Sequence, residues 1–151
     1  MNFPAIDPIA FTIGPLAVRW YSLSYIIGIL IGLILINKFI ITYKKNITKN
    51  NVYDLLNYLI LGIIIGGRLG YVFFYNLEFY FYNPFEILKI WNGGMSFHGA
   101  IIGVIISIAW FSFKNNKSFF DLTDIICLGS PIGIFFGRIA NFINGELYGK
   151  V

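Results

Sequence analysis

Residues 20–41 read WYSLSYIIGILIGLILINKFII, and this stretch decides the class of the fold. It carries a single charged side chain, Lys38, close to its end. A helix of about 20 apolar residues is long enough to cross the hydrocarbon layer of a bilayer. The stretch therefore predicts a membrane-spanning helix, and the residues before it predict a segment that lies outside the membrane.

Three further stretches have the same character, at residues 54–76, 95–113 and 122–143. The whole chain of 151 residues is 58% hydrophobic and 12% charged, whereas soluble domains average about 25% charged residues. We therefore predict an all-α fold, a polytopic membrane helix bundle with about four transmembrane helices, formed by residues 1–151 as one integral-membrane domain.

The lysines indicate how these helices are oriented. Connection 42–53 carries three lysines and connection 114–121 carries two, whereas connection 77–94 has Lys89 against Glu78 and Glu86. Basic residues concentrate in cytoplasmic loops. The pattern predicts that the two lysine-rich connections are cytoplasmic and that the N-terminus and connection 77–94 lie on the outer side. Topology thus accounts for the net charge of +4, and no nucleic-acid partner is expected.

The arginines follow a different distribution. Arg68 lies inside the second predicted span and Arg138 inside the fourth, both in the outer half of the membrane under the orientation above. An arginine at such a depth costs about 2.5 to 3.5 kcal/mol on an insertion scale, so it needs a partner or a purpose. Other polar residues occur at the same depth. Together they predict an outward-facing polar cavity bounded by Tyr21, Arg68, His98, Arg138, Asn141 and Glu146. Because guanidinium groups match phosphate oxygens, an anionic phospholipid headgroup is the expected ligand.

Simpler interpretations stay open for the individual residues. Tyr21 is also typical of an aromatic belt at the membrane surface, and Arg68 is also compatible with a structural ion pair, for which Glu146 is one candidate partner. His98, the only histidine, suits general-base chemistry or a plain interfacial position. The single cysteine, Cys127, supports neither an internal disulfide nor a metal cluster, and no metal site is predicted.

Longer sequence strings narrow the choice. GRIANFINGELYG at 137–149 resembles the signature of the bacterial prolipoprotein diacylglyceryl transferase family, whose pattern is Gly-Arg, two residues, Asn-Phe, an apolar residue, Asn, one residue, Glu, two residues, Gly. The strings at 5–25, GGRLGYVFFYN at 66–76 and WNGGMSFHGAIIG at 91–103 resemble the family in the same order. The resemblance covers essentially the whole chain.

The resemblance implies an enzyme of the bacterial inner membrane, with its N-terminus and active site on the periplasmic side. Such enzymes transfer the diacylglyceryl group of phosphatidylglycerol to the lipobox cysteine in the signal peptide of a preprolipoprotein, without a cofactor. By motif, it implies catalytic roles for His98, Arg138 and Tyr21, with His98 as candidate base and Arg138 on the leaving phosphate. It implies lipid binding by Arg138, Asn141, Glu146 and Gly149. Arg68 is not assigned by the motif, and from its depth in the membrane we expect it to hold either phosphatidylglycerol or local structure.

The resemblance also implies a longer protein, because the family has about seven membrane-spanning helices. We therefore expect the 151-residue chain to be the N-terminal portion of a transferase, and to be inactive or poorly folded alone. Topology by itself also fits a second class, a non-catalytic anionic-lipid-binding or transporter subunit.

Overall fold

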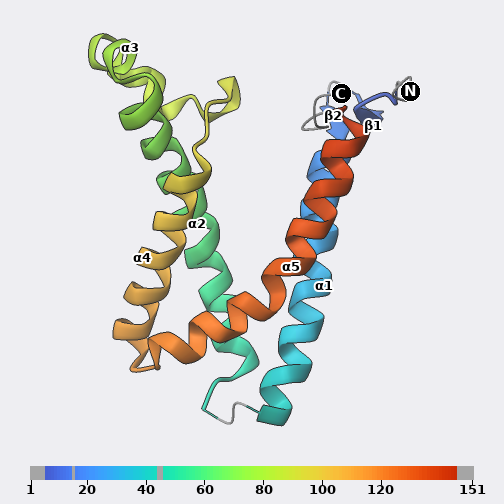
Figure 1. The fold of residues 1–151 in the computed structure, drawn as a ribbon, viewed down its shortest axis with the longest axis vertical. Helices are drawn as coiled ribbons and strands as arrows, with labels where there is room; N and C mark the ends of the chain where they lie inside the picture. The colour runs from blue at the N-terminus through green and yellow to red at the C-terminus, as the bar shows by residue number, and fades with distance from the viewer. Residues whose placement is uncertain (1–5, 15, 44–45, 146–151) are drawn as a thin grey trace, which may run out of the picture. The chain divides into compact units, whose positions relative to one another are not determined.

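The computed structural model describes residues 6–14, 16–43 and 46–145. Within this part, four helices are long and apolar enough to cross a membrane. They are α1 (Trp20–Tyr43), α2 (Lys49–Tyr75), α4 (Phe97–Asn115) and α5 (Phe119–Ile143), as Figure 1 shows. The predicted all-α membrane fold is thereby confirmed. The chain divides into two compact units, residues 1–43 with 124–151 and residues 44–123, which are described separately below.

The first unit begins with a hairpin that the sequence analysis did not predict. Strands β1 (Ile9–Ile13) and β2 (Leu16–Arg19) pair antiparallel, with Ile13 opposite Leu16 and Ile9 opposite Arg19. Gly14 adopts a φ of 59° at the turn, a conformation that glycine reaches without steric cost. The main-chain N–H of Trp20 donates to the oxygen of Pro8 at 3.2 Å. The hairpin is thus tied to the first turn of α1.

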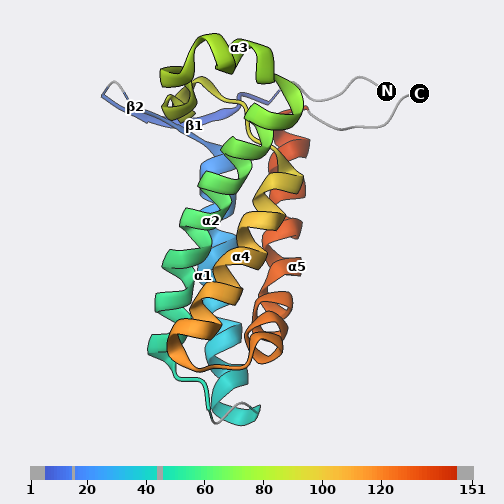
Figure 2. The same cartoon turned by 90° about the vertical axis from the view of Figure 1, so that its left-hand side faces the viewer.

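Helix α1 lies beside the C-terminal part of α5 in both views of the fold (Figures 1 and 2). Glycines make this close approach possible: a Cβ added to Gly28 would lie 3.2 Å from the Cα of Gly133, and one added to Gly32 would lie 3.7 Å from the oxygen of Gly129. Small residues allow helix backbones to approach closely where lipid gives no hydrophobic drive. The two contacts also fix an antiparallel register between the helices.

The second unit is built on a still closer antiparallel pair, α2 with α4. A Cβ on Gly70 would lie 2.7 Å from the Cα of Gly99, and one on Gly66 would lie 2.9 Å from the Cα of Gly103. The hydroxyl of Ser107 donates to the main-chain oxygen of Tyr58 at 2.9 Å across the same interface. The Lys114 ammonium of α4 also donates to the Tyr58 hydroxyl of α2 at 3.0 Å. Close packing and inter-helical hydrogen bonds therefore hold the pair together.

The two lysine-rich connections contact each other at one end of this unit. The Lys117 ammonium donates to the main-chain oxygen of Asn46 at 2.7 Å. Helix α2 begins at Lys49, earlier than the predicted residue 54, because Thr48 and Asn51 form a capping box in which each side chain accepts from the other's main-chain N–H. Such a cap satisfies N–H groups that a helix start leaves without partners. The polar first turn is helical for that reason.

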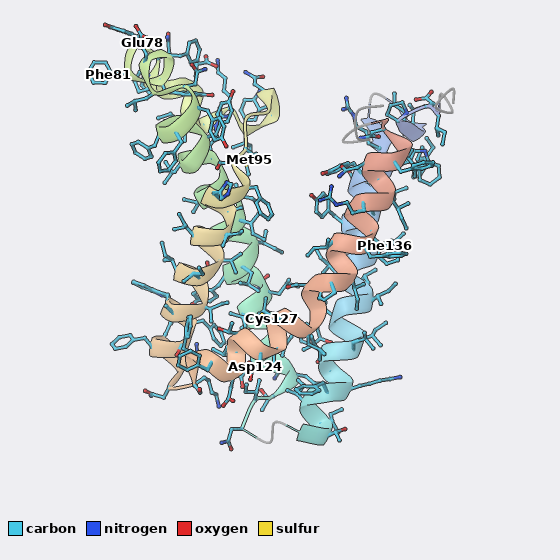
Figure 3. The ribbon with its side chains drawn as sticks, in the orientation of Figure 1. Glu78, Phe81, Met95, Asp124, Cys127 and Phe136 are labelled. Atoms are coloured by element: carbon cyan, nitrogen blue, oxygen red, sulfur yellow. The ribbon has the colours of Figure 1, made fainter. Side chains whose placement is uncertain are left out.

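The other end of the unit carries three short elements: α3 (Leu77–Tyr82) and the 3₁₀ turns η1 (Pro84–Leu88) and η2 (Ile90–Asn92). Their aromatic side chains are largely exposed; Phe81 on α3, labelled in Figure 3, is 80% exposed. The chain then passes Met95, also labelled, and enters α4. This end is the one that positions the predicted site residues of the unit.

Candidate functional site

Tyr21 is the second residue of α1 and is half-buried. Tyr25 follows one turn later, with its ring centroid 5.1 Å from that of Tyr21, and its hydroxyl donates to the Tyr21 hydroxyl at 3.4 Å. Two phenol oxygens are thus presented together near the hairpin end of the helix. This pair can donate to an acceptor such as a phosphate oxygen.

Arg138 and Asn141 lie three residues apart on α5, so they share one face of the helix. Arg138 is exposed and Asn141 is half-buried. Within the described residues the Arg138 guanidinium makes no hydrogen bond or ion pair. Extending the register set by Gly28 and Gly133 along both helices brings Asn141 to the level of the first turn of α1. Tyr21, Arg138 and Asn141 therefore belong to the same end of the first unit.

His98 is the second residue of α4 and is exposed. Ser96 caps this helix: its hydroxyl accepts from the N–H of Gly99 at 3.2 Å, and its own N–H donates to the oxygen of Gly67 on α2 at 2.8 Å. The Phe97 ring packs edge-on at 5.9 Å from the imidazole centroid. The imidazole is therefore held on a capped helix start and stays accessible.

Arg68 has the opposite environment, because it is only 4% exposed. Its guanidinium donates to main-chain oxygens of the segment that runs from η1 to the start of α4, and the Tyr80 ring lies over it at 5.1 Å. The accepting oxygens belong to Glu86, Ile87, Lys89, Gly93 and Gly94. All five N–H groups of the side chain donate to these oxygens. This favours a role for Arg68 in holding local structure over a role in holding lipid.

Sequence reasoning missed most of the residues around Arg68. Gly93 and Gly94 both adopt a φ of 82°, and a Cβ on Gly94 would lie 2.6 Å from the Tyr71 ring and 3.0 Å from an Arg68 nitrogen. A Gly-Gly pair is a recognisable turn signal. The other acceptors carry no signal, because every residue type offers the same main-chain oxygen. Tyr80 and the buried cap Ser96 were likewise not identified.

The predicted site residues thus fall into two sets. Tyr21, Arg138 and Asn141 belong to the first unit, and Arg68 and His98 to the second. Glu146 and Gly149 lie outside the described residues. A single polar cavity that unites the two sets stays a prediction. Among the described residues, no group of three or more His, Cys, Asp or Glu side chains is placed to hold a metal ion.

An apolar groove runs along the α2–α4 pair. Its volume is about 450 Å³, and its floor is formed by the glycines of the helix interface. Branched and aromatic side chains, among them Ile65, Phe73 and Trp110, form its walls. A surface of this kind suits hydrocarbon rather than a polar group.

Comparison with known proteins gives one consistent result. The family model described as prolipoprotein diacylglyceryl transferase matches residues 8–151. A phosphatidylglycerol–prolipoprotein diacylglyceryl transferase of Rickettsia felis is 58% identical over all 151 residues, which cover 58% of that protein. The proteins of the same name from Rickettsia canadensis and Rickettsia bellii are 56% and 58% identical over the whole chain, which covers 58% and 57% of them. The chain therefore spans less than two thirds of the length of these relatives.

Proposed function

The chain belongs to the prolipoprotein diacylglyceryl transferase family, and we propose that it is the N-terminal portion of an integral membrane enzyme that acts on phosphatidylglycerol. In the proposed reaction, the diacylglyceryl group is transferred to the lipobox cysteine in the signal peptide of a preprolipoprotein. The names of the relatives support both substrates. The four apolar helices support the membrane setting.

The exposed Arg138 is the observation that carries this proposal. It lies on an apolar helix, and its guanidinium has no partner among the described residues. An arginine in a membrane helix costs about 2.5 to 3.5 kcal/mol on an insertion scale, so a chain that keeps its donors free there needs an anion to bind. The phosphate of a phospholipid supplies one at the right depth, and the guanidinium fork matches its oxygens.

The chemistry assigns a role to each polar group. The thiol sulfur of the lipobox cysteine attacks the glycerol carbon, a carbon–sulfur bond forms, and the carbon–oxygen bond to phosphate breaks to release glycerol phosphate. His98 takes the thiol proton, since thiolate is the nucleophilic form. Arg138 stabilises the charge that develops on the leaving phosphate. Tyr21, Asn141, Glu146 and Gly149 complete the lipid site.

We place the enzyme in the bacterial inner membrane, with the hairpin and the 77–94 connection on the periplasmic side. The Lys117 contact to Asn46 supports this orientation, because it gathers the two basic connections at one end of the second unit. No cofactor is required by the reaction. An anionic-lipid-binding or transporter subunit shares the lipid site but lacks the transfer step.

The transfer step is tested in bacteria depleted of their own diacylglyceryl transferase. The chain is co-expressed there with the C-terminal part of the Rickettsia felis relative that it does not cover, and a reporter lipoprotein is followed by its shift in electrophoretic mobility. We expect the reporter to become lipidated, and a reporter with cysteine changed to serine to stay unmodified. If the co-expressed protein binds phosphatidylglycerol but the reporter is not lipidated, the result would support the non-catalytic class instead.

A further inference from the structure

Arg68 holds a segment of main chain rather than a counter-ion. Its Nε donates to the oxygen of Ile87 at 2.9 Å, and one terminal nitrogen donates to Glu86 at 2.7 Å and Lys89 at 3.3 Å. The other terminal nitrogen donates to the oxygens of Gly93 and Gly94. We call residues 86–94 the carbonyl loop. All five donors of one side chain thus bind one short loop.

No carboxylate in the described part of the chain pairs with this charge. The side chain of Glu86 accepts from the Lys89 ammonium instead, and only its main-chain oxygen faces Arg68. The guanidinium charge is stabilised by the dipoles of the loop carbonyls and by the face of the Tyr80 ring. The feature that demands arginine here is therefore the fixed geometry of five donors, which a lysine does not reproduce.

The carbonyl loop leads directly to His98. Its last two members, Gly93 and Gly94, are followed by Met95, which lies against α2 near Gly67, and by the cap Ser96. The N–H of Ser96 donates to the oxygen of Gly67, the residue before Arg68. Two consecutive residues of α2 therefore fix both the loop and the point at which α4 begins.

We propose that Arg68 is a positioning residue, which sets the place of His98 through the carbonyl loop, and that it is not a ligand of the phospholipid. The proposal rests on the proposed function in its use of His98 as the base. A phosphate bound by Arg68 would have to displace the loop carbonyls from the buried guanidinium, and these oxygens would lose the donor that they now share.

Two substitutions distinguish a role for Arg68 in holding the carbonyl loop, which we call the clamp, from a role in binding lipid. Arg68→Lys keeps the charge but offers one nitrogen, which cannot reach Glu86 and Gly94 together; Arg68→Gln removes the charge. Both are expected to release the carbonyl loop. Lys89→Gln is the matched control, because it removes a cation of the same loop while its main-chain oxygen remains, and a partly exposed ion pair contributes little.

The first measurement needs no catalysis. The 151-residue chain is placed in nanodiscs of phosphatidylglycerol or of phosphatidylcholine, and amide hydrogen exchange of residues 86–96 is followed. The imidazole signal of His98, the only histidine, is recorded in parallel. We expect slow exchange and one sharp signal in both lipids for the parent chain and Lys89→Gln. For both Arg68 variants we expect at least about tenfold faster exchange and a broadened or split signal.

Unchanged exchange in Arg68→Lys, or loop protection that appears only with phosphatidylglycerol, would overturn the proposal. The second measurement is the transfer assay with the complementing C-terminal part. There Arg68→Lys is expected to lower kcat with little change in the KM for phosphatidylglycerol; a raised KM with an intact loop would identify Arg68 as a lipid ligand. If the parent protein transfers no diacylglyceryl group, the proposed function fails. The exchange data still show whether Arg68 holds the carbonyl loop.

Discussion

Two arginines on apolar helices of this protein have opposite surroundings. Arg68 is buried and donates to five main-chain oxygens, whereas Arg138 is exposed and its donors are free within the described residues. The same side chain thus binds the protein's own main chain in one helix and, among the described residues, keeps its donors free in another, as the two proposed roles require. The two arginines can therefore be told apart by their burial and their hydrogen-bond partners, but not by residue type.

Replacing Arg138 by lysine tests its assignment to phosphate. Because the charge is retained but the two-pronged geometry is lost, we expect Arg138→Lys to insert and fold normally and to lose transfer activity by at least about tenfold. The measurement is lipidation of a lipobox peptide at saturating phosphatidylglycerol, made with the chain complemented by the part of the Rickettsia felis relative that it does not cover. Arg19→Lys, which changes an exposed arginine on β2, is the control and should retain activity. A near-parental rate for Arg138→Lys would remove phosphate recognition from that side chain.

At the residue scale the sequence identified candidates but not their partners. Intramembrane arginines are rare, so Arg68 and Arg138 could be selected from the sequence alone. The environment of Arg68 could not be predicted, because its acceptors are main-chain oxygens set by the two positive φ angles at Gly93 and Gly94. The Tyr80 ring over the guanidinium comes from α3, a short helix that hydropathy does not reveal.

At the scale of elements, the α2–α4 pair depends on glycine at its interface. A Cβ on Gly66 would overlap the main-chain oxygen of Gly99 and lie 2.9 Å from the Cα of Gly103. Both neighbours are backbone atoms, so the strain cannot be relieved by a rotamer change. The helices themselves would have to separate.

Gly66→Ala is therefore expected to destabilise the pair by about 3 kcal/mol. Gly133→Ala is the control, since a Cβ there meets no atom within 4 Å and alanine is the better helix former by up to about 1 kcal/mol. Unfolding of the chain by dodecyl sulfate in mixed micelles measures the free energy of unfolding of both variants. Equal stability of the two would show that the close approach of α2 and α4 is not maintained in solution.

The long helices were predictable and the short elements were not. Hydropathy located all four long helices because each must be apolar over its length. The start of α2 was missed since the capping box of Thr48 and Asn51 makes its first turn polar. The β1–β2 hairpin and α3 lie outside the apolar runs, where neither composition nor periodicity gives a strong signal.

For the whole molecule, the orientation that we propose in the membrane rests on the basic connections. Cysteines introduced at Asn2 and Asn83 are expected to react with a membrane-impermeant thiol reagent in intact spheroplasts, after Cys127 is changed to serine. A cysteine at Asn46 should react only after the membrane is opened, because its connection is predicted to be cytoplasmic. The reverse labelling pattern would place the site residues on the cytoplasmic face.

The share of the relatives that the chain covers leads to a further prediction. The 151 residues correspond to 58% of the Rickettsia felis protein, and the transfer that we propose requires Tyr21, Arg138 and His98 to act on one lipid. We expect the chain alone to leave a transferase-depleted strain unrescued. Co-expression with the remaining part of the relative is expected to restore growth, and Gly133→Ala is expected to be tolerated in that setting. Rescue by the chain alone would show that these residues suffice.

The most direct test of the central claim is chemical. Purified chain, combined with the remaining part of the Rickettsia felis relative, is incubated with a lipobox peptide in phosphatidylglycerol vesicles, and the peptide is analysed by mass spectrometry. We predict a diacylglyceryl group joined to the cysteine sulfur by a thioether, with release of one glycerol phosphate per modified peptide. An unmodified cysteine, in a preparation that binds phosphatidylglycerol and folds correctly, would contradict the assignment as a transferase.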